Sequence, residues 1–507
     1  MMDRLLSWIS KNKKEFWLIL AILLAALIFR LWRINEYLPF LGDEGRDLRV
    51  VRRFLTDFDL MFIGPRTSIG DMYLGPAYYY LISPFLLLFG FSPTGPAVFV
   101  ALTSTATVFL IWITSREWFG KAAAFSAAAL YAVSPSVINL AKHSWNPNIM
   151  PFFALLSVWS VWRVWKYAEF KWLLVLGFSF AVSLQSHYLG LLLAPLLILY
   201  WLLTLKSLWL DKKKISIFFK FSGFSLLIFT LLMFPLVLFD AKHDWLNFNS
   251  LKRFFLERQT TVSAKPWGAL PFLEPFWREQ FIGRLLTAGH AFGRTMWISF
   301  SILALSLWVG YFWKKRKDTR LIPYILLVVW FFTGAIGLGL LKQNIYEHYF
   351  GFLFPLPFLL VGAIVQSLFQ KGLKTPAILL VVVLIWFNLQ NNPIKNPPQR
   401  QVQQVQEINK QIIADSANEP FNFGLIAERN YEEGYLYFFE LANAKVREIN
   451  PLDTANTLTR QLYVVCEDLI CEPINHRKAE IANFGWAKIE KQWKVEGKTI
   501  FKLVHTQ

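Results

Sequence analysis

Long apolar runs recur along the chain from Phe16 to about residue 390, and they limit the choice of fold more than any other feature. Hydrophobic residues make up 55% of the 507 positions and charged residues only 17%, against about a quarter in ordinary soluble domains. About 20 consecutive apolar residues are enough to cross a bilayer. We therefore predict a polytopic α-helical membrane protein. The first run follows the basic KNKK and lacks a small-residue cleavage site, so we expect a retained helix and not a signal peptide.

Basic loops between the apolar runs set the expected orientation. Short basic stretches belong to the cytoplasm under the positive-inside rule, which places the N-terminus inside and the C-terminus outside a plasma (inner) membrane. If segment 77–91 crossed the membrane, every later basic loop would face outward, so we predict an interfacial or re-entrant segment there. About eleven spans follow, at 16–33, 95–114, 121–138, 149–165, 172–187, 189–205, 216–239, 295–313, 321–341, 347–368 and 375–389.

The net charge of +18 does not indicate a nucleic-acid partner. From residue 391 onward the chain has 14 Lys and Arg against 15 Asp and Glu, so the basic excess lies in the membrane part. A nucleic-acid site would need basic residues clustered on one soluble face.

The chain is expected to have two domains. Residues 1–390 form the membrane domain, with a first external loop at 34–94 and a long external loop at 240–294. The first loop contains RDLRVVRRFLTDF, whose apolar spacing predicts an amphipathic helix lying on the membrane. After a Pro/Asn/Gln linker, residues 391–507 mix helical and strand patterns and predict an extracytoplasmic α/β or α+β domain. Cys466 and Cys471 could form a disulfide or remain two free thiols.

An adjacent acid pair, Asp43 and Glu44, follows the first apolar run. A carboxylate in such a partly dry position is suited to act as a general base. The alternative is a solvated loop end in which Arg46 or Arg49 balances the acids, since charged loop ends are common.

Four other external loops carry polar and aromatic groups on the same expected side of the membrane. Each alone is more often an interfacial anchor than a site, but together they suggest a site at the outer face. Cations suit a lipid phosphate, and aromatic faces with amides suit a sugar. The candidates are Tyr78 and Tyr79, then Lys142, His143, Asn146 and Asn148, then His187 and Tyr188, and finally His348.

No nucleotide-binding or zinc-protease motif is present in the sequence, so no cofactor is predicted with certainty. Three acids of the first loop, Asp43, Glu44 and Asp71, could hold a hard divalent cation.

The order of these elements resembles a known family. An acid pair after the first span, then GPAYYYLISP in place of an H/K-P-P-L-Y-Y segment, then SREWFGKAAAFSAAALYAVSP, is similar to the GT-C membrane glycosyltransferases. The resemblance is to the protein O-mannosyltransferase and aminoarabinose-transferase-like group (family 39) over most of residues 16–390. It implies a polyprenyl-phosphate sugar donor, a protein, lipid or glycan acceptor, and transfer with inversion at the outer face.

The resemblance also assigns residues. The family's first-loop base matches Asp43, with Glu44 beside it. Asn146 and Asn148 stand where relatives often have an acid, and Gly75 stands where they often have a cation or His. The donor phosphate would then be held by other residues, namely Lys142, His143, Arg66, Arg46 or His187, of which His187 is preferred because relatives often have a Thr-Lys pair at Ser186-His187.

Two other classes of function remain as alternatives. A transporter or lipid flippase would be expected to carry ionisable or helix-breaking residues near the middle of the membrane. An assembly protein of the cell envelope would leave the acid pair unexplained.

Overall fold

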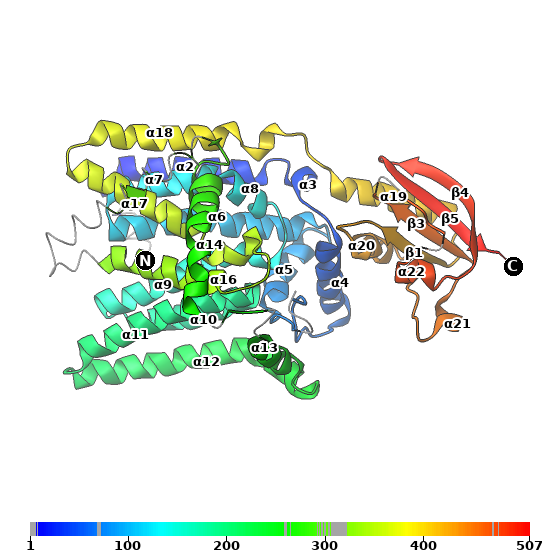
Figure 1. The fold of residues 1–507 in the computed structure, drawn as a ribbon, viewed down its shortest axis with the longest axis horizontal. Helices are drawn as coiled ribbons and strands as arrows, with labels where there is room; N and C mark the ends of the chain where they lie inside the picture. The colour runs from blue at the N-terminus through cyan, green and yellow to red at the C-terminus, as the bar shows by residue number, and fades with distance from the viewer. Residues whose placement is uncertain are drawn as a thin grey trace. The chain divides into compact units, whose positions relative to one another are not determined.

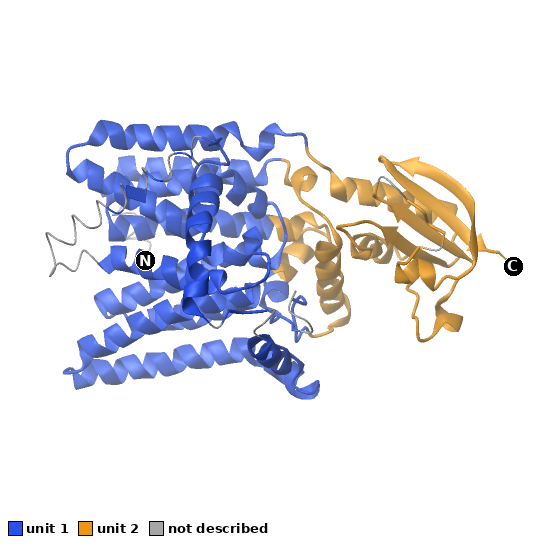
Figure 2. Ribbon diagram, viewed as in Figure 1, with its two compact units in different colours: residues 1–32, 61–81, 98–397 blue, residues 33–60, 82–97, 398–507 orange. Residues whose placement is uncertain are grey.

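The computed structural model describes residues 9–67, 72–257, 261–263, 265–291, 322–468, 471–474 and 476–506, with Ser7 and isolated positions between 293 and 305. They form two compact units, which Figure 2 colours separately. Unit 1 comprises residues 1–32, 61–81 and 98–397, and unit 2 comprises 33–60, 82–97 and 398–507. Part of the predicted first external loop thus belongs to the same unit as the predicted C-terminal domain.

Unit 1 is helical. The long helices α9 to α12 pack side by side (Figure 1). Its elements are α2 (Lys13–Leu31), α7 (Lys121–Val133), α8 (Pro135–Ala141), η1 (Asn146–Ile149), α9 (Met150–Tyr167), α10 (Trp172–Ser186), η2 (Tyr188–Leu193), α11 (Ala194–Leu208), α12 (Lys212–Lys242), α13 (Leu246–Leu256), η3 (Pro266–Ala269), α14 (Leu270–Pro275), η4 (Phe276–Leu286), α16 (Ile322–Gly339), η6 (Glu347–Leu353), α17 (Pro355–Gln370), α18 (Lys374–Gln390) and η7 (Pro393–Lys395). Helices α5 (Ala77–Leu88) and α6 (Thr94–Trp118) contribute residues to both units.

The prediction of a multi-pass helical membrane protein is confirmed. Among the described residues, five helices are long and apolar enough to cross a membrane, and up to seven if each of two bent pairs is one span. The predicted span 295–313 lies largely outside the described residues. Helix α5 has 12 residues and would rise about 18 Å, less than the roughly 30 Å of hydrocarbon.

Two predicted spans are bent at prolines. Between α7 and α8 the chain turns by 61° at Pro135, and between η6 and α17 it turns by 46° at Pro355. Proline lacks the N–H that a continuing helix needs and its ring clashes with the preceding turn, but it fits the first turn of a new helix. The predicted spans 121–138 and 347–368 did not anticipate these bends, although the prolines are visible in the sequence.

Small residues let the helices of unit 1 approach one another closely. A Cβ atom added to Gly362 of α17 would lie 2.9 Å from the carbonyl oxygen of Ala123 in α7.

The guanidinium of Arg30, fully buried at the end of α2, donates to the Ser104 hydroxyl at 2.9 Å and to the Ala132 carbonyl at 3.0 Å. These bonds satisfy a charged group that would otherwise be costly to bury.

Unit 2 combines a mixed five-stranded sheet with short helices (Figure 1). The strand order is β2-β1-β3-β5-β4; β1 is parallel to β2 and β3, and β5 is antiparallel to β3 and β4. The elements are α3 (Ile34–Tyr37), α4 (Gly42–Asp57), α19 (Gln401–Asp415), β1 (Phe421–Ile426), α20 (Glu433–Leu441), β2 (Val446–Arg447), α21 (Thr454–Thr457), β3 (Gln461–Cys466), α22 (Ala479–Ala482), β4 (Ala487–Val495) and β5 (Lys498–His505).

The local sequence explains these strands. Every residue of β1 and of β3 is buried, as expected for central strands with helices or loops on both faces. Strands β4 and β5 are joined by Glu496 and Gly497, whose positive φ angles of 48° and 77° match a tight hairpin turn. Cys466, at the end of β3, forms a disulfide with Cys471, which decides between the two alternatives that the spacing left open.

Candidate functional site

The predicted site residues fall in both units. Asp43, Glu44 and Arg46 belong to unit 2, and the other predicted residues belong to unit 1.

In unit 1, three predicted loops bring their rings together. The Trp145 indole centroid lies 4.3 Å from that of His348 and 5.2 Å from that of His143, with which it is stacked. The His187 imidazole lies 6.0 Å from that of His348 and 4.8 Å from the Tyr349 ring. These three loops therefore form one aromatic and imidazole cluster, which we call the ring cluster: His143, Trp145, His187, His348 and Tyr349.

Two asparagines hold the loops that carry the ring cluster. The Asn146 amide donates to the Ser186 carbonyl at 2.6 Å, and the Asn148 amide donates to the His143 carbonyl at 3.0 Å. Nδ1 of His187 accepts the backbone N–H of Leu189 at 3.2 Å, so its ring proton is on Nε2. His187 in this arrangement offers a hydrogen-bond donor and not a positive charge.

Lys142 is the buried cation next to the ring cluster in sequence. Its side chain is almost entirely buried and Nζ donates to the Trp32 carbonyl at 3.3 Å. Burial lowers the pKa of Lys142 to about 8, because desolvation disfavours the ammonium form. Lys142 is thus expected to lose its positive charge as the pH rises through about 8.

Predicted residues of the Tyr78 segment are mostly buried. The Tyr78 hydroxyl is 2.9 Å from the Ser144 hydroxyl, which ties the start of α5 to the 142–148 loop, and the Tyr79 ring is buried. Arg66 is exposed and pairs across a short antiparallel bridge with Tyr73.

The structure explains why position 75 is glycine. A Cβ atom added to Gly75 would lie 2.2 Å from Oε1 of Gln185, which also accepts the Ala77 N–H at 3.0 Å. Nε2 of the same side chain donates to the Leu232 carbonyl at 3.0 Å. Gln185 thus fills the space that a cation or imidazole at position 75 would need. The sequence prediction missed this role because the two residues are 110 positions apart.

An apolar cavity of about 630 Å³ adjoins this region of unit 1. Tyr188, Gln185 and Gly75 line it together with residues of α12, α13 and α16. Leucine, valine and phenylalanine supply most of the lining, so the cavity suits a hydrocarbon chain.

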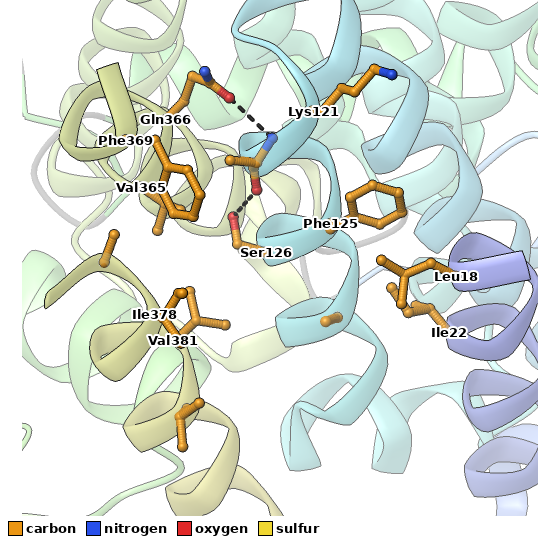
Figure 3. A pocket seen from close by; sticks show the side chains of 14 residues that line it. Leu18, Ile22, Lys121, Phe125, Ser126, Val365, Gln366, Phe369, Ile378 and Val381 are labelled. Carbon is orange, nitrogen blue, oxygen red and sulfur yellow. Dashed lines mark hydrogen bonds between the residues drawn. The ribbon is translucent and has the colours of Figure 1, made fainter. Parts of the chain in front are cut away.

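A second cavity of about 740 Å³ lies between α2, α7, α17 and α18 (Figure 3). Its lining is apolar apart from Lys121, Ser126 and Gln366. Gln366 accepts the Ala122 N–H at 3.0 Å, and Ser126 donates to the Ala122 carbonyl at 2.8 Å. Since these polar groups serve the start of α7, and none of the predicted site residues lines the cavity, we do not assign the chemistry to it.

In unit 2, the acid pair occupies the first turn of α4. Oε2 of Glu44 accepts the Leu41 N–H at 2.8 Å and the side chain is buried, as in a helix N-terminal cap. The Asp43 side chain is 39% exposed, enough for a substrate to reach it. Arg46 donates to Oδ1 of Asp43 at 2.9 Å and to Oδ1 of Asp47 at 2.8 Å, so it balances both acids.

Within the described residues, no group of three or more His, Cys, Asp and Glu is arranged to hold a metal ion. Asp71, one of the three acids considered for a cation, lies outside the described residues.

One segment of the chain matches a family of known proteins. Residues 74–234, which supply the 142–148 and 185–188 loops, match the family model of dolichyl-phosphate-mannose-protein mannosyltransferases. The chain is similar to this family over that segment. It is 23% identical over 235 residues to the Bacillus subtilis (strain 168) protein named "Putative mannosyltransferase YkcB"; the match covers 45% of this chain and about a third, 31%, of that relative's length.

Two solved structures have a similar fold to this chain. ArnT from Cupriavidus metallidurans, crystallised with undecaprenyl phosphate, has 12% sequence identity and a TM-score of 0.57, with 97% of this chain and 98% of ArnT covered. The oligosaccharyltransferase AglB from Archaeoglobus fulgidus, in complex with an inhibitory peptide and a dolichol-phosphate, has 13% identity and a TM-score of 0.54, with 90% and 70% covered. The predicted GT-C resemblance is thereby confirmed.

Proposed function

We propose that this protein transfers a glycosyl group from a polyprenyl-phosphate-linked sugar to an acceptor at the outer face of the membrane. The observation that carries the proposal is the match of residues 74–234 to the mannosyltransferase family, on the segment that supplies most of the ring cluster. The undecaprenyl phosphate bound to ArnT and the dolichol-phosphate bound to AglB support a lipid-phosphate donor.

The residues of unit 1 fit the parts of such a donor. Lys142 supplies a cation for the phosphate, and Nε2 of His187 supplies a hydrogen bond. The half-buried Trp145 offers an aromatic surface for a sugar ring, and the buried Tyr349 packs against His187 and His348. The apolar cavity beside Tyr188 would take the first isoprene units.

In the proposed reaction, Asp43 takes the proton from the acceptor hydroxyl or amine. The acceptor atom forms a bond to the anomeric carbon as the bond from that carbon to the phosphate oxygen breaks, and configuration inverts. The phosphate leaves as an anion with no need for a general acid, because its conjugate acid is already strong. The Glu44 side chain accepts the Leu41 N–H and so stabilises the first turn of α4, which contains Asp43.

We propose that the chain crosses the membrane about eleven times, with the N-terminus in the cytoplasm and the C-terminal part outside. Ten of the predicted spans overlap helices of the structure, and the other is 295–313. The Cys466–Cys471 disulfide supports an extracytoplasmic position for the tail, because disulfides persist in oxidising compartments.

The experiment is incubation of the purified protein with a panel of undecaprenyl-phosphate-linked sugars, including mannose, with and without Mg²⁺. Transfer or slow hydrolysis of at least one sugar, with release of undecaprenyl phosphate, is the expected result. Lipid movement across liposomes without cleavage of the sugar–phosphate bond would instead favour a flippase.

A further inference from the structure

A residue of the C-terminal part of unit 2 contacts the acid at the start of α4. The Tyr431 hydroxyl donates to Oδ1 of Asp43 at 2.7 Å, and Arg46 donates to the same oxygen at 2.9 Å. Arg46 also donates to the Tyr431 hydroxyl oxygen at 3.2 Å. Oδ2 of Asp43 takes part in none of these bonds. The carboxylate is therefore held through Oδ1, and Oδ2 is the oxygen that can meet a substrate.

Local bonds fix the position of Tyr431. Oδ1 of Asn430 accepts both the Gly42 N–H and the Tyr431 N–H at 2.9 Å, which links the first turn of α4 to the segment before α20. Nδ2 of Asn430 donates to Glu467 at 3.1 Å, just beyond β3. The segment that carries Tyr431 is therefore fixed to the first turn of α4 and to the end of β3.

Two glycines make this close approach feasible. A Cβ atom added to Gly42 would lie 2.4 Å from the Tyr431 ring, and one added to Gly45 would lie 2.3 Å from the backbone nitrogen of Gly434. Real Cβ atoms do not tolerate such distances. The two glycines of the GDEG stretch in α4 thus leave the space that residues 431–434 occupy.

We propose that Tyr431 is a positioning residue for Asp43, the proposed base of the transfer. The inference rests on the proposed function and extends the site to a residue outside segment 74–234, which matches the family model. By holding Oδ1, Tyr431 and Arg46 direct Oδ2 toward the acceptor.

The surroundings keep the phenol protonated. Burial, and then the charge of Asp43 and Asp47 against the opposing charge of Arg46, raises the pKa of Tyr431 above its ordinary value. The charged and titratable groups that face its hydroxyl are Asp43, Arg46 and Asp47 of α4. Tyr431 is consequently a hydrogen-bond donor throughout the working pH range.

The test compares Tyr431→Phe with a matched control, Tyr463→Phe. Tyr463 also donates to an aspartate, Asp415, at 2.8 Å, but on the sheet of unit 2. With the best undecaprenyl-phosphate sugar of the panel, Tyr431→Phe should lower kcat about tenfold, as expected when a charge-assisted hydrogen bond is lost. Its KM for the donor should stay within about twofold, since the tyrosine touches the base and not the donor.

The split between kcat and KM separates positioning from a structural role. Loss of a positioning residue should lower kcat and leave the KM for the donor nearly unchanged, because the donor does not touch it. Tyr463→Phe should keep both values within about twofold of the wild type. Equal kcat in the two variants would overturn the inference.

Asp43→Asn distinguishes failure of this inference from failure of the proposed function. If Asp43→Asn is inactive while Tyr431→Phe behaves as Tyr463→Phe does, only the role of Tyr431 is wrong. If Asp43→Asn is as active as the wild type, the proposed base is wrong and the positioning role fails with it.

Discussion

Arg49 is the side chain whose removal should weaken unit 2 most. Its side chain is 8% exposed, and the guanidinium bonds three carboxylates: Glu433 at 2.6 Å, Glu440 at 2.6 Å, and Glu448. The first two belong to α20, so this cluster fastens α4 to the C-terminal part of the unit. Replacing Arg49 with Met keeps the apolar stem but leaves the acids without their shared cation.

The size of the effect follows from burial. Removing one partner of a buried ion pair costs roughly 3–5 kcal/mol. Glu433 and Glu440 are 23% and 21% exposed, so water recovers part of the loss and the lower end applies, about 3 kcal/mol. Glu448 is 59% exposed and adds little.

Hydrogen exchange measured by mass spectrometry on the full-length protein checks this value. Because 1.4 kcal/mol corresponds to a factor of ten, amides of α4 should exchange about a hundredfold faster in Arg49→Met. Arg53→Met is the control: Arg53 lies one turn further along α4, is 50% exposed and is 3.5 Å from Glu440. Its effect should stay within about threefold. Equal exchange in the two variants would refute the reasoning.

Two further predictions concern unit 1. The kcat/KM for the donor should fall as pH rises through about 8, because Lys142 loses its proton there and with it the charge that binds phosphate. In Lys142→Arg, which stays charged, kcat/KM should not change between pH 7 and 9. The same fall of kcat/KM in that variant would exclude Lys142 as its cause. Gly75→Ala should lower the melting temperature in detergent because its Cβ would meet Gln185, and Gln185→Ala should restore part of the loss when combined with it; additive losses would contradict the steric account.

Patterns local in the sequence predicted the elements well. The apolar run FNFGLI became the fully buried strand β1, and the amphipathic RDLRVVRRFLTDF lies in α4. These features depend on burial of neighbouring residues, which periodicity and composition record directly. The bends at Pro135 and Pro355 also have a local signal, which is the proline at the first turn of each following helix.

Contacts between distant segments could not be predicted in this way. Tyr431 and Asp43 are 388 positions apart, and nothing near Tyr431 in the sequence distinguishes it from the other tyrosines of the tail. Gln185 and Gly75 are related only through shared space. The three ring-bearing loops, by contrast, were found because each carried an unusual set of polar and aromatic residues between apolar runs.

The most direct test of the proposed function is the release of undecaprenyl phosphate from an undecaprenyl-phosphate sugar by purified wild type, Asp43→Asn and Asp57→Asn. Asp57 lies at the other end of α4 and is exposed, so its variant makes the same chemical change away from the proposed base. Asp43→Asn should release phosphate at least about a hundredfold more slowly, as loss of a general base does, while Asp57→Asn should stay within about twofold of the wild type. Near-normal release by Asp43→Asn would contradict the assignment of Asp43 as the base.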